Sequence, residues 1–159
     1  MFLETARLFL RPFQLQDYSY LHSRHHPTIV SHPDYEMTLL EELDLFLKKP
    51  KNHPLKKQIR IALILKETQA FIGDITVNYR DKTLALSFAT QPAYQKQGLM
   101  HEALTTFLAY LQSHYPALEI VCLVPKNNNI SQQLLENLNF VPIQYLFDFD
   151  CHLYTRKNE

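Results

Sequence analysis

The chain has 159 residues, of which 46% are hydrophobic, enough apolar mass for the core of one domain and too little for two. Its 16 basic and 16 acidic side chains cancel, which argues against a whole-molecule attraction to nucleic acid or to an anionic membrane. The first residues lack the pattern of a signal segment, and no stretch approaches the roughly 18 apolar residues of a membrane span. We therefore expect a single domain over residues 1–159, located in the cytoplasm.

The first third of the chain contains apolar patterns of a strand and of two helices. Residues 6–13 alternate so that Leu8 and Leu10 share one face of a strand. Apolar residues at helical spacing begin at Leu15, and Thr38 could cap a second helix.

The middle of the chain changes from short runs to a long helical pattern. Three β-like runs, 58–65, 70–79 and 84–90, are separated by turn-like segments and predict an antiparallel meander. From residue 96 to residue 115 a broad apolar stripe predicts a helix packed on a sheet. The continuous apolar run 118–124 is typical of a strand buried on both faces.

The last quarter predicts a shorter helix from Ser131 to Leu138, and then one or two strands between residues 141 and 156. Strands and helices in this mixed order indicate an α/β protein with one sheet covered by helices.

The two cysteines, Cys122 and Cys151, lie in apolar runs and lack CxxC spacing. This pattern argues against a disulfide framework, so we expect two buried, reduced thiols. Burial would also raise the pKa of Cys122 and make it a poor nucleophile.

Gly98 is one of only two glycines, and it falls where a predicted strand meets the broad helix. The first N–H groups of a helix have no intrahelical acceptor, and the positive end of the helix dipole attracts anions. Glycine permits a close approach. The segment 95–100 can therefore receive a pyrophosphate, with an ordinary tight turn as the alternative.

The segment YQKQGLMHEAL resembles the coenzyme A loop of the GNAT superfamily, Gln/Arg-x-x-Gly-x-Gly/Ala, in the form found in RimJ/RimL-type N-acetyltransferases. Three further stretches are similar to that family in the same order: ETARLFLRPFQLQDY to its opening, FIGDITV to its third strand and NNISQQLLENLNF to its Asn-x-x-Ser helix. The resemblance covers almost the whole chain. It implies the GNAT fold, a mixed sheet of six to seven strands with about four helices, in which the fourth and fifth strands splay apart.

The resemblance also implies an N-acetyltransferase that uses acetyl-CoA, with the pantetheine arm between the splayed strands. The residues expected to bind this cofactor are Phe88, Ala89, Thr90, Gln95, Lys96, Gln97, Gly98, Leu99, Met100, Asn128 and Ser131. Backbone N–H groups around Phe88 and Ala89 are the implied donors to the thioester carbonyl. Ser131 is the implied catalytic acid that protonates the leaving thiolate, and a helix cap is its alternative role.

Three positions depart from the family pattern. Ala85 stands where many relatives have a Glu that serves as the base, so the base is unassigned. Met100 replaces the Gly or Ala of the loop, and Asn139 replaces the glycine before a phenylalanine, a mild change because Asn adopts the left-handed conformation. The other strand groups that could face a cleft are Asp74, Tyr79, Asp148, Asp150 and His152.

A histidine cluster precedes the meander: His22, His25, His26 and His32. It contains an i, i+4 pair of the kind that binds zinc, but no further ligand follows at a familiar spacing. We predict structural or cleft-lining histidines and no metal site.

The absence of the usual base bears on the acceptor. A free α-amino group titrates near pH 8 and a lysine near 10.4, so a weak base suits an α-amine better. We predict direct attack, in a ternary complex, by the α-amine of a protein N-terminus, a peptide or a small molecule. The alternatives are an acyl-CoA-binding domain without catalysis, which Ala85 favours, and an acetyltransferase for a polyamine, amino sugar or antibiotic.

The final segment is rich in apolar side chains, among them Tyr145, Phe147 and Phe149. As an edge strand it could pair with a second copy and form a homodimer.

Overall fold

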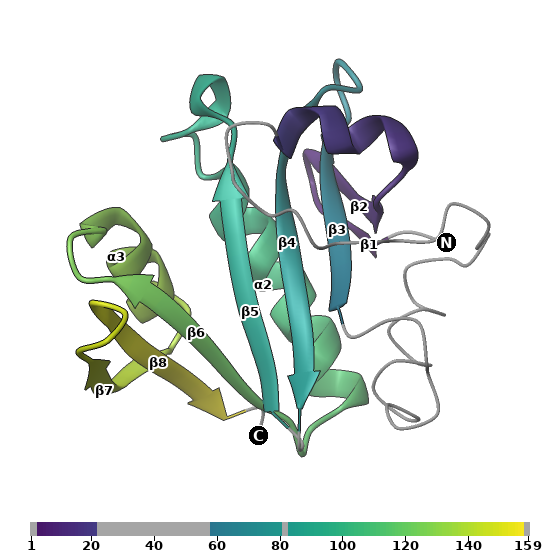
Figure 1. Cartoon of the computed structure of the whole chain (residues 1–159). Coiled ribbons are helices and arrows are strands. Elements are labelled where there is room, and N and C mark those ends of the chain that lie inside the picture. Colours follow the sequence, from purple (N-terminus) through teal and green to yellow (C-terminus); the bar gives the residue numbers. More distant parts are fainter. Residues whose placement is uncertain (1–2, 22–57, 81–82, 158–159) are drawn as a thin grey trace.

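The computed structural model describes residues 3–21, 58–80 and 83–157. Within these ranges one mixed sheet of eight strands has the order β1-β2-β3-β4-β5-β6-β8-β7 (Figure 1). The strands are β1 (Leu3–Glu4), β2 (Leu8–Pro12), β3 (Gln58–Leu65), β4 (Phe71–Arg80), β5 (Thr83–Thr90), β6 (Glu119–Pro125), β7 (Val141–Leu146) and β8 (Cys151–Lys157). The helices are the 3-10 segments η1 (Leu15–Leu21) and η3 (Pro92–Tyr94) and the α-helices α2 (Leu99–His114) and α3 (Asn129–Asn137).

The predicted fold is confirmed, with a correction to the number of strands. Six to seven strands were expected and eight are present, because the two-residue β1 pairs with β2 and is too short to leave a periodic signal. The helical pattern that begins at Leu15 forms η1 as far as Leu21. The helix expected from Thr38 lies outside the described residues.

The strands β3 to β5 form the predicted antiparallel meander, and β2, within the strand expected over residues 6–13, extends it. The strands β5 and β6 then pair in parallel, but only from Thr83 opposite Glu119 to Leu86 opposite Cys122. Beyond that point they separate, while β6 stays paired with β8 along its whole length (Figure 1). This is the expected splay, and it falls between the fifth and sixth strands because β1 adds one to the count.

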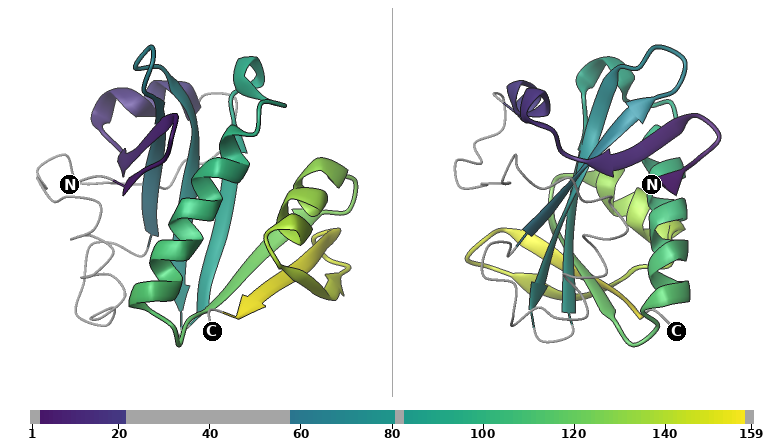
Figure 2. Two further views of the ribbon diagram at one scale, coloured as in Figure 1. Left: turned by 180° about the vertical axis from the view of Figure 1, so that it is seen from behind. Right: turned by 90° about the vertical axis from the view of Figure 1, so that its right-hand side faces the viewer.

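The main core lies between the sheet and α2, which crosses the sheet diagonally in the left view of Figure 2. In β3 the side chains of Ile59, Ile61 and Leu63 join this core. The buried positions of α2 include Leu99, Ala103, Leu104, Phe107, Leu108 and Leu111, which form the broad stripe that predicted this packing. The apolar stripe of the sequence therefore holds the start of α2 firmly against the strands.

The opposite sheet face carries a smaller cluster beside η1. Phe13 packs against Phe71, with the ring of Tyr18 edge-on to Phe13. Nearby, Arg60 on β3 and Asp74 on β4 form an ion pair with an N–O distance of 3.2 Å, and both side chains are almost completely buried. Such a pair fixes the alignment of β3 and β4 more than it stabilises the fold.

The prediction that β6 is buried on both faces is wrong. Ile120, Cys122 and Val124 are buried, whereas Leu123 on the other face is 48% exposed. The alternation arises because Ile120, Cys122 and Val124 face the core that α2 and α3 form with the sheet, whereas Leu123 points to the opposite face.

Candidate active site

A cavity of about 350 Å³ opens where the end of β5, the loop after it and the first turns of α2 and α3 come together. Its lining includes every residue expected to bind the cofactor except Gln97. The expected lining residues are Phe88, Ala89, Thr90, Gln95, Lys96, Gly98, Leu99, Met100, Asn128 and Ser131. The side chain of Gln97 instead donates to the backbone carbonyl of Ala93, at 3.4 Å. The backbone carbonyl of Gln97 accepts a hydrogen bond from Arg7.

The loop before α2 contains two residues in the left-handed conformation. Lys96 has a φ of 64°, and Gly98, the N-cap of α2, has a φ of 74°. A Cβ atom on Gly98 would find only Arg7 Nη2 nearby, at an ordinary contact distance of 3.6 Å. Glycine is therefore favoured here by its backbone conformation and not by crowding within the protein. The result is an abrupt helix start, with its free N–H groups beside the cavity.

The other glycine shapes the floor of the same cavity. A Cβ atom on Gly73 would lie 2.4 Å from the carbonyl oxygen of Ala89 and 3.1 Å from the Cα atom of Thr90. No side chain fits at this separation, so β4 and the end of β5 approach closely only because position 73 is glycine.

The start of α3 supplies the opposite wall. Asn128 is the N-cap of this helix, and its side-chain oxygen accepts a hydrogen bond of 3.1 Å from the backbone N–H of Ser131. The alternative role of Ser131 as the cap is therefore wrong. Because Asn128 serves as the cap, the Ser131 hydroxyl is left to line the cavity.

A second, smaller cavity of about 80 Å³ lies in the gap between the splayed strands. It shares Phe88, Asn128 and Ser131 with the main cavity and adds Ser87 and residues of β6. Ser131 therefore stands where the two cavities meet, beside the part of β5 that has lost its parallel partner.

The charges around the main cavity suit an anionic ligand. The part of its lining that the structure describes contains Lys96 and His101 and no Asp or Glu. The positive end of the α2 dipole and the unpaired N–H groups of its first turn also favour a negatively charged ligand. A pyrophosphate therefore fits the donors at the loop, and the apolar lining from Leu99, Ile130 and Leu134 fits an alkyl arm.

Four lining residues were missed from the sequence: Tyr94, His101, Ile130 and Leu134. His101 follows Gly98 by three positions, within the first turn of α2, and that spacing was the only available signal. The others depend on how η3 and α3 meet, which no local pattern reports.

The residues considered as possible bases lie in different environments. Ala85 faces no carboxylate on the neighbouring strand, where its pairing partner is Asn78. Asp74 is buried in its ion pair with Arg60. Asp148 is exposed in the turn between β7 and β8, and Asp150 in that turn bonds Tyr145 and lies 3.3 Å from Lys126.

Of the two remaining candidate positions, only His152 has a described side chain. His152 lies on β8 with its ring 5.1 Å from that of Tyr145, and it lines neither cavity. The side chain of Tyr79 lies outside the described part of the structure.

The two thiols differ in their environment. Cys122 is buried as expected, and this burial raises its pKa to about 12, which is the direction predicted from the sequence. Cys151 was also expected to be buried but is partly exposed, because it opens β8 beside the exposed turn. Both are free thiols.

The histidine cluster His22, His25, His26 and His32 lies outside the described residues. Among residues 3–21, 58–80 and 83–157, no group of three or more possible metal ligands comes together. In the same part of the chain, no helix has the length and apolar character needed to cross a membrane.

Comparison with known proteins identifies the family. Residues 7–141 match the acetyltransferase (GNAT) domain. No curated protein has a matching sequence. Among solved structures, the chain is similar to a GNAT-family acetyltransferase from Bacillus anthracis, with a TM-score of 0.69 and 19% identity over 99% of each chain.

Two other solved structures have the same fold. One is a mutant spermidine N-acetyltransferase from Vibrio cholerae, with a TM-score of 0.70 and 17% identity over 96% of this chain and 95% of that one. The other is the ribosomal-protein-S5-alanine acetyltransferase from Vibrio fischeri, with a TM-score of 0.70 and 15% identity over 100% and 97%. The chain therefore belongs to the GNAT acetyltransferase family, whose enzymes are N-acetyltransferases that use acetyl-CoA as the acyl donor.

Proposed function

We propose that this protein is a RimJ/RimL-type enzyme that acetylates an α-amine of a protein N-terminus, a peptide or a small molecule by direct attack in a ternary complex. The observation that carries the proposal is the junction of the two cavities at Ser131. There the pantetheine arm of a donor bound along the main cavity can enter the gap between β5 and β6, so that its thioester lies beside Ser131, where the acceptor amine meets it.

Each wall of the junction has a role in this proposal. The loop from Gln95 to Met100 holds the pyrophosphate, and the neutral, largely apolar walls exclude water around the arm. Acetyl-CoA supplies the thioester that the amine attacks. The backbone N–H of Phe88 polarises the carbonyl, because it faces the β6 side of β5, which is open there, whereas the N–H of Ala89 points toward β4. The Ser131 Oγ–H protonates the departing sulfur.

The acceptor class follows from the charges near the junction. Among the residues that the structure describes, neither cavity is lined by Asp or Glu, whereas a polycation such as a polyamine is expected to need carboxylates around it. An α-amine is partly neutral at pH 7 to 8, so it can attack without a strong base, and Ala85 provides none. The fold shared with the ribosomal-protein-S5-alanine acetyltransferase is consistent with an N-terminal amine as acceptor.

The cofactor site is tested first, with thermal shifts of the wild type and of Gly98→Asp in the presence of acetyl-CoA. Ligand at 100 times its Kd stabilises the folded state by about 2.7 kcal/mol, enough to raise Tm by several degrees. The aspartate adds bulk and negative charge at the loop, so the shift should disappear. An equal shift in both proteins would place the cofactor elsewhere.

The acceptor is tested by competition between two peptides of identical sequence. One has a free N-terminus and its lysine side chain blocked, and the other has an acetylated N-terminus and a free lysine. Mass spectrometry should find the label from acetyl-CoA mainly on the first. Preferential labelling of lysine would contradict the α-amine assignment, and binding of acetyl-CoA without transfer to any amine would favour a non-catalytic role.

A further inference from the structure

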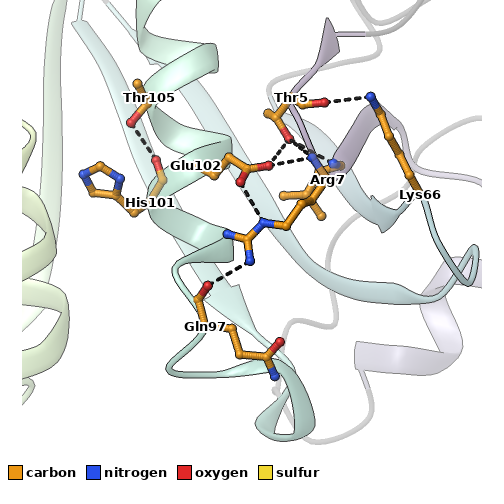
Figure 3. A network of polar contacts seen from close by, with 8 residues as sticks. Thr5, Arg7, Lys66, Gln97, His101, Glu102 and Thr105 are labelled. Carbon is orange, nitrogen blue, oxygen red and sulfur yellow. Dashed lines mark hydrogen bonds and ion pairs between the residues drawn. The ribbon is translucent and has the colours of Figure 1, made fainter.

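A polar network outside the cavity ties the first strands of the sheet to the start of α2 (Figure 3). Arg7 Nε donates to Glu102 Oε1 at 2.8 Å, and the Arg7 backbone N–H donates to Glu102 Oε2 at 2.9 Å. The Thr5 hydroxyl also donates to Glu102. Arg7 Nη1 donates to the carbonyl oxygen of Gln97 at 3.1 Å. One side chain thus bonds both the loop before α2 and the helix itself.

The bond to Gln97 fixes the peptide plane that carries the Gly98 N–H. In a planar trans peptide the C=O and the N–H point in opposite directions. Because the Gln97 carbonyl is held toward Arg7, the N–H of Gly98 points away from Arg7. In Figure 3, Arg7 and the cavity-lining His101 lie on opposite sides of the start of α2. The bond outside the cavity thereby orients a donor on the side of the cavity.

The ion pair with Glu102 removes an electrostatic conflict. Glu102 is an acidic residue in the first turn of α2, where its charge would repel an anion bound at the same helix end. The Arg7 guanidinium, at 2.8 Å, neutralises this carboxylate on the side away from the cavity. The helix start therefore stays available for the ligand's negative charge.

We propose that Arg7 is a positioning residue of the acetyl-CoA loop, which orients the Gly98 N–H through the Gln97 carbonyl and shields the bound pyrophosphate from Glu102. This inference rests on the proposed cofactor site. It assigns the effect of Arg7 to donor binding and not to the amine or to the transfer of the acetyl group.

The test compares acetyl-CoA with acetyl-pantetheine, which carries the same thioester and lacks the pyrophosphate. Arg7→Met should raise the KM and the Kd for acetyl-CoA by about tenfold, the effect of losing one charge-assisted hydrogen bond. Its kcat/KM for acetyl-pantetheine and its KM for the amine should stay at the wild-type values. The double variant R7M/E102Q should recover part of the acetyl-CoA affinity, because the uncompensated carboxylate is then absent.

Lys66→Met is the matched control, since Lys66 bonds Glu4 and the carbonyl of Thr5 on the same strands without touching the loop. Lys66→Met should leave the kcat/KM values for acetyl-CoA and for acetyl-pantetheine unchanged. Arg7→Lys keeps the charge but cannot bridge Glu102 and Gln97 together, so it should lie between wild type and Arg7→Met and remains informative if the latter unfolds.

The outcomes separate this inference from the site on which it rests. Equal losses with acetyl-CoA and acetyl-pantetheine, or no loss with either Arg7 variant, would overturn the role of Arg7 while Gly98→Asp still abolished binding. Acetyl-CoA binding that is insensitive to Gly98→Asp would overturn the site itself and the inference with it.

Discussion

Gly73 on β4 lies so close to Ala89 on β5 that a Cβ atom at position 73 would be 2.4 Å from the Ala89 carbonyl oxygen. The contact is between backbones of paired strands, because Asp74 is the partner of Ala89 and Gly73 that of Thr90. Both Ala89 and Thr90 line the main cavity. A glycine outside the cavity therefore controls the position of its floor.

Replacing Gly73 by Ala should damage the fold and the site together. The added methyl group must displace the end of β5, and overpacking of this kind costs about 1–3 kcal/mol of unfolding free energy. Urea unfolding measures the loss, and calorimetry should find weaker acetyl-CoA binding. Gly98→Asn is the comparison, since it meets no clash and Asn tolerates a positive φ. Unchanged stability in Gly73→Ala would show that β5 yields without cost.

Exchanges at Asn128 and Ser131 should separate stability from chemistry. Asn128→Ala removes the N-cap of α3 and should cost about 1 kcal/mol of stability, which Asn128→Asp should retain. Ser131→Ala removes the proposed proton donor and should lower kcat on the order of a hundredfold with little change in Tm. Steady-state kinetics and thermal unfolding of the three variants check this. A Ser131→Ala enzyme with normal kcat at every pH would remove Ser131 from the mechanism.

Acid should weaken the network around Glu102. Burial alone would raise the pKa of this carboxyl, but hydrogen bonds from Thr5 and Arg7 outweigh burial and hold the pKa below its ordinary value of 4.5. The folded protein therefore binds this proton less readily than the unfolded chain. The stability that Glu102 contributes is complete above about pH 4.5 and is lost as the pH falls through the lowered pKa.

Glu102→Gln should accordingly be less stable than the wild type at pH 7 and should lose less stability on acidification. Urea midpoints between pH 7 and pH 3 measure both slopes. Parallel slopes in the two proteins would mean that the acid sensitivity comes from other carboxyls.

The two thiols should react at different rates with a disulfide reagent at pH 8. The pKa of Cys122 is raised to about 12 by burial, so its thiolate is scarce and inaccessible in the folded protein. Cys151 is partly exposed and should react first. Absorbance should report one fast thiol in native protein and two in urea, and Cys151→Ser should remove the fast one. Rapid reaction of Cys122 in that variant would indicate opening of the gap beside β6.

Much of the fold was predictable because the decisive signals are local. The stripe on α2 is wide enough to require a sheet beneath it, and the alternation in β2 correctly placed Leu8 and Leu10 on one face, which the structure shows to be the core face. The β1 strand was missed since two residues carry no period. The exposed face of β6 was also missed, because its composition is apolar and only the packing of α2 and α3 on one side of the sheet leaves Leu123 in contact with solvent on the other.

A residue of the candidate site could be predicted where its type alone indicates a particular local backbone conformation. Gly98 belongs to this class, because a glycine was expected at the start of α2 and lies there, although its left-handed φ was not predicted. The cap of α3 does not belong to it, since Ser131 was the cap considered from the sequence and Asn128 is the cap in the structure. The contributions of Tyr94 and Ile130 depend on the meeting of segments far apart in sequence, and they leave no periodic or spacing signal. The orientation of Gln97 was unpredictable for a related reason, since its carbonyl is turned by an arginine 90 positions earlier.

The brief pairing of β5 with β6 also bears on solubility. Where the two strands part, the protein carries an open strand edge in the middle of its sheet, and open edges invite aggregation with other chains. Here the first turn of α3 stands over the opening, and the space that remains is about 80 Å³. A β-strand of another protein is too large to enter this cavity. The fold can thus keep unpaired backbone groups permanently exposed to a slender ligand while denying them to another protein.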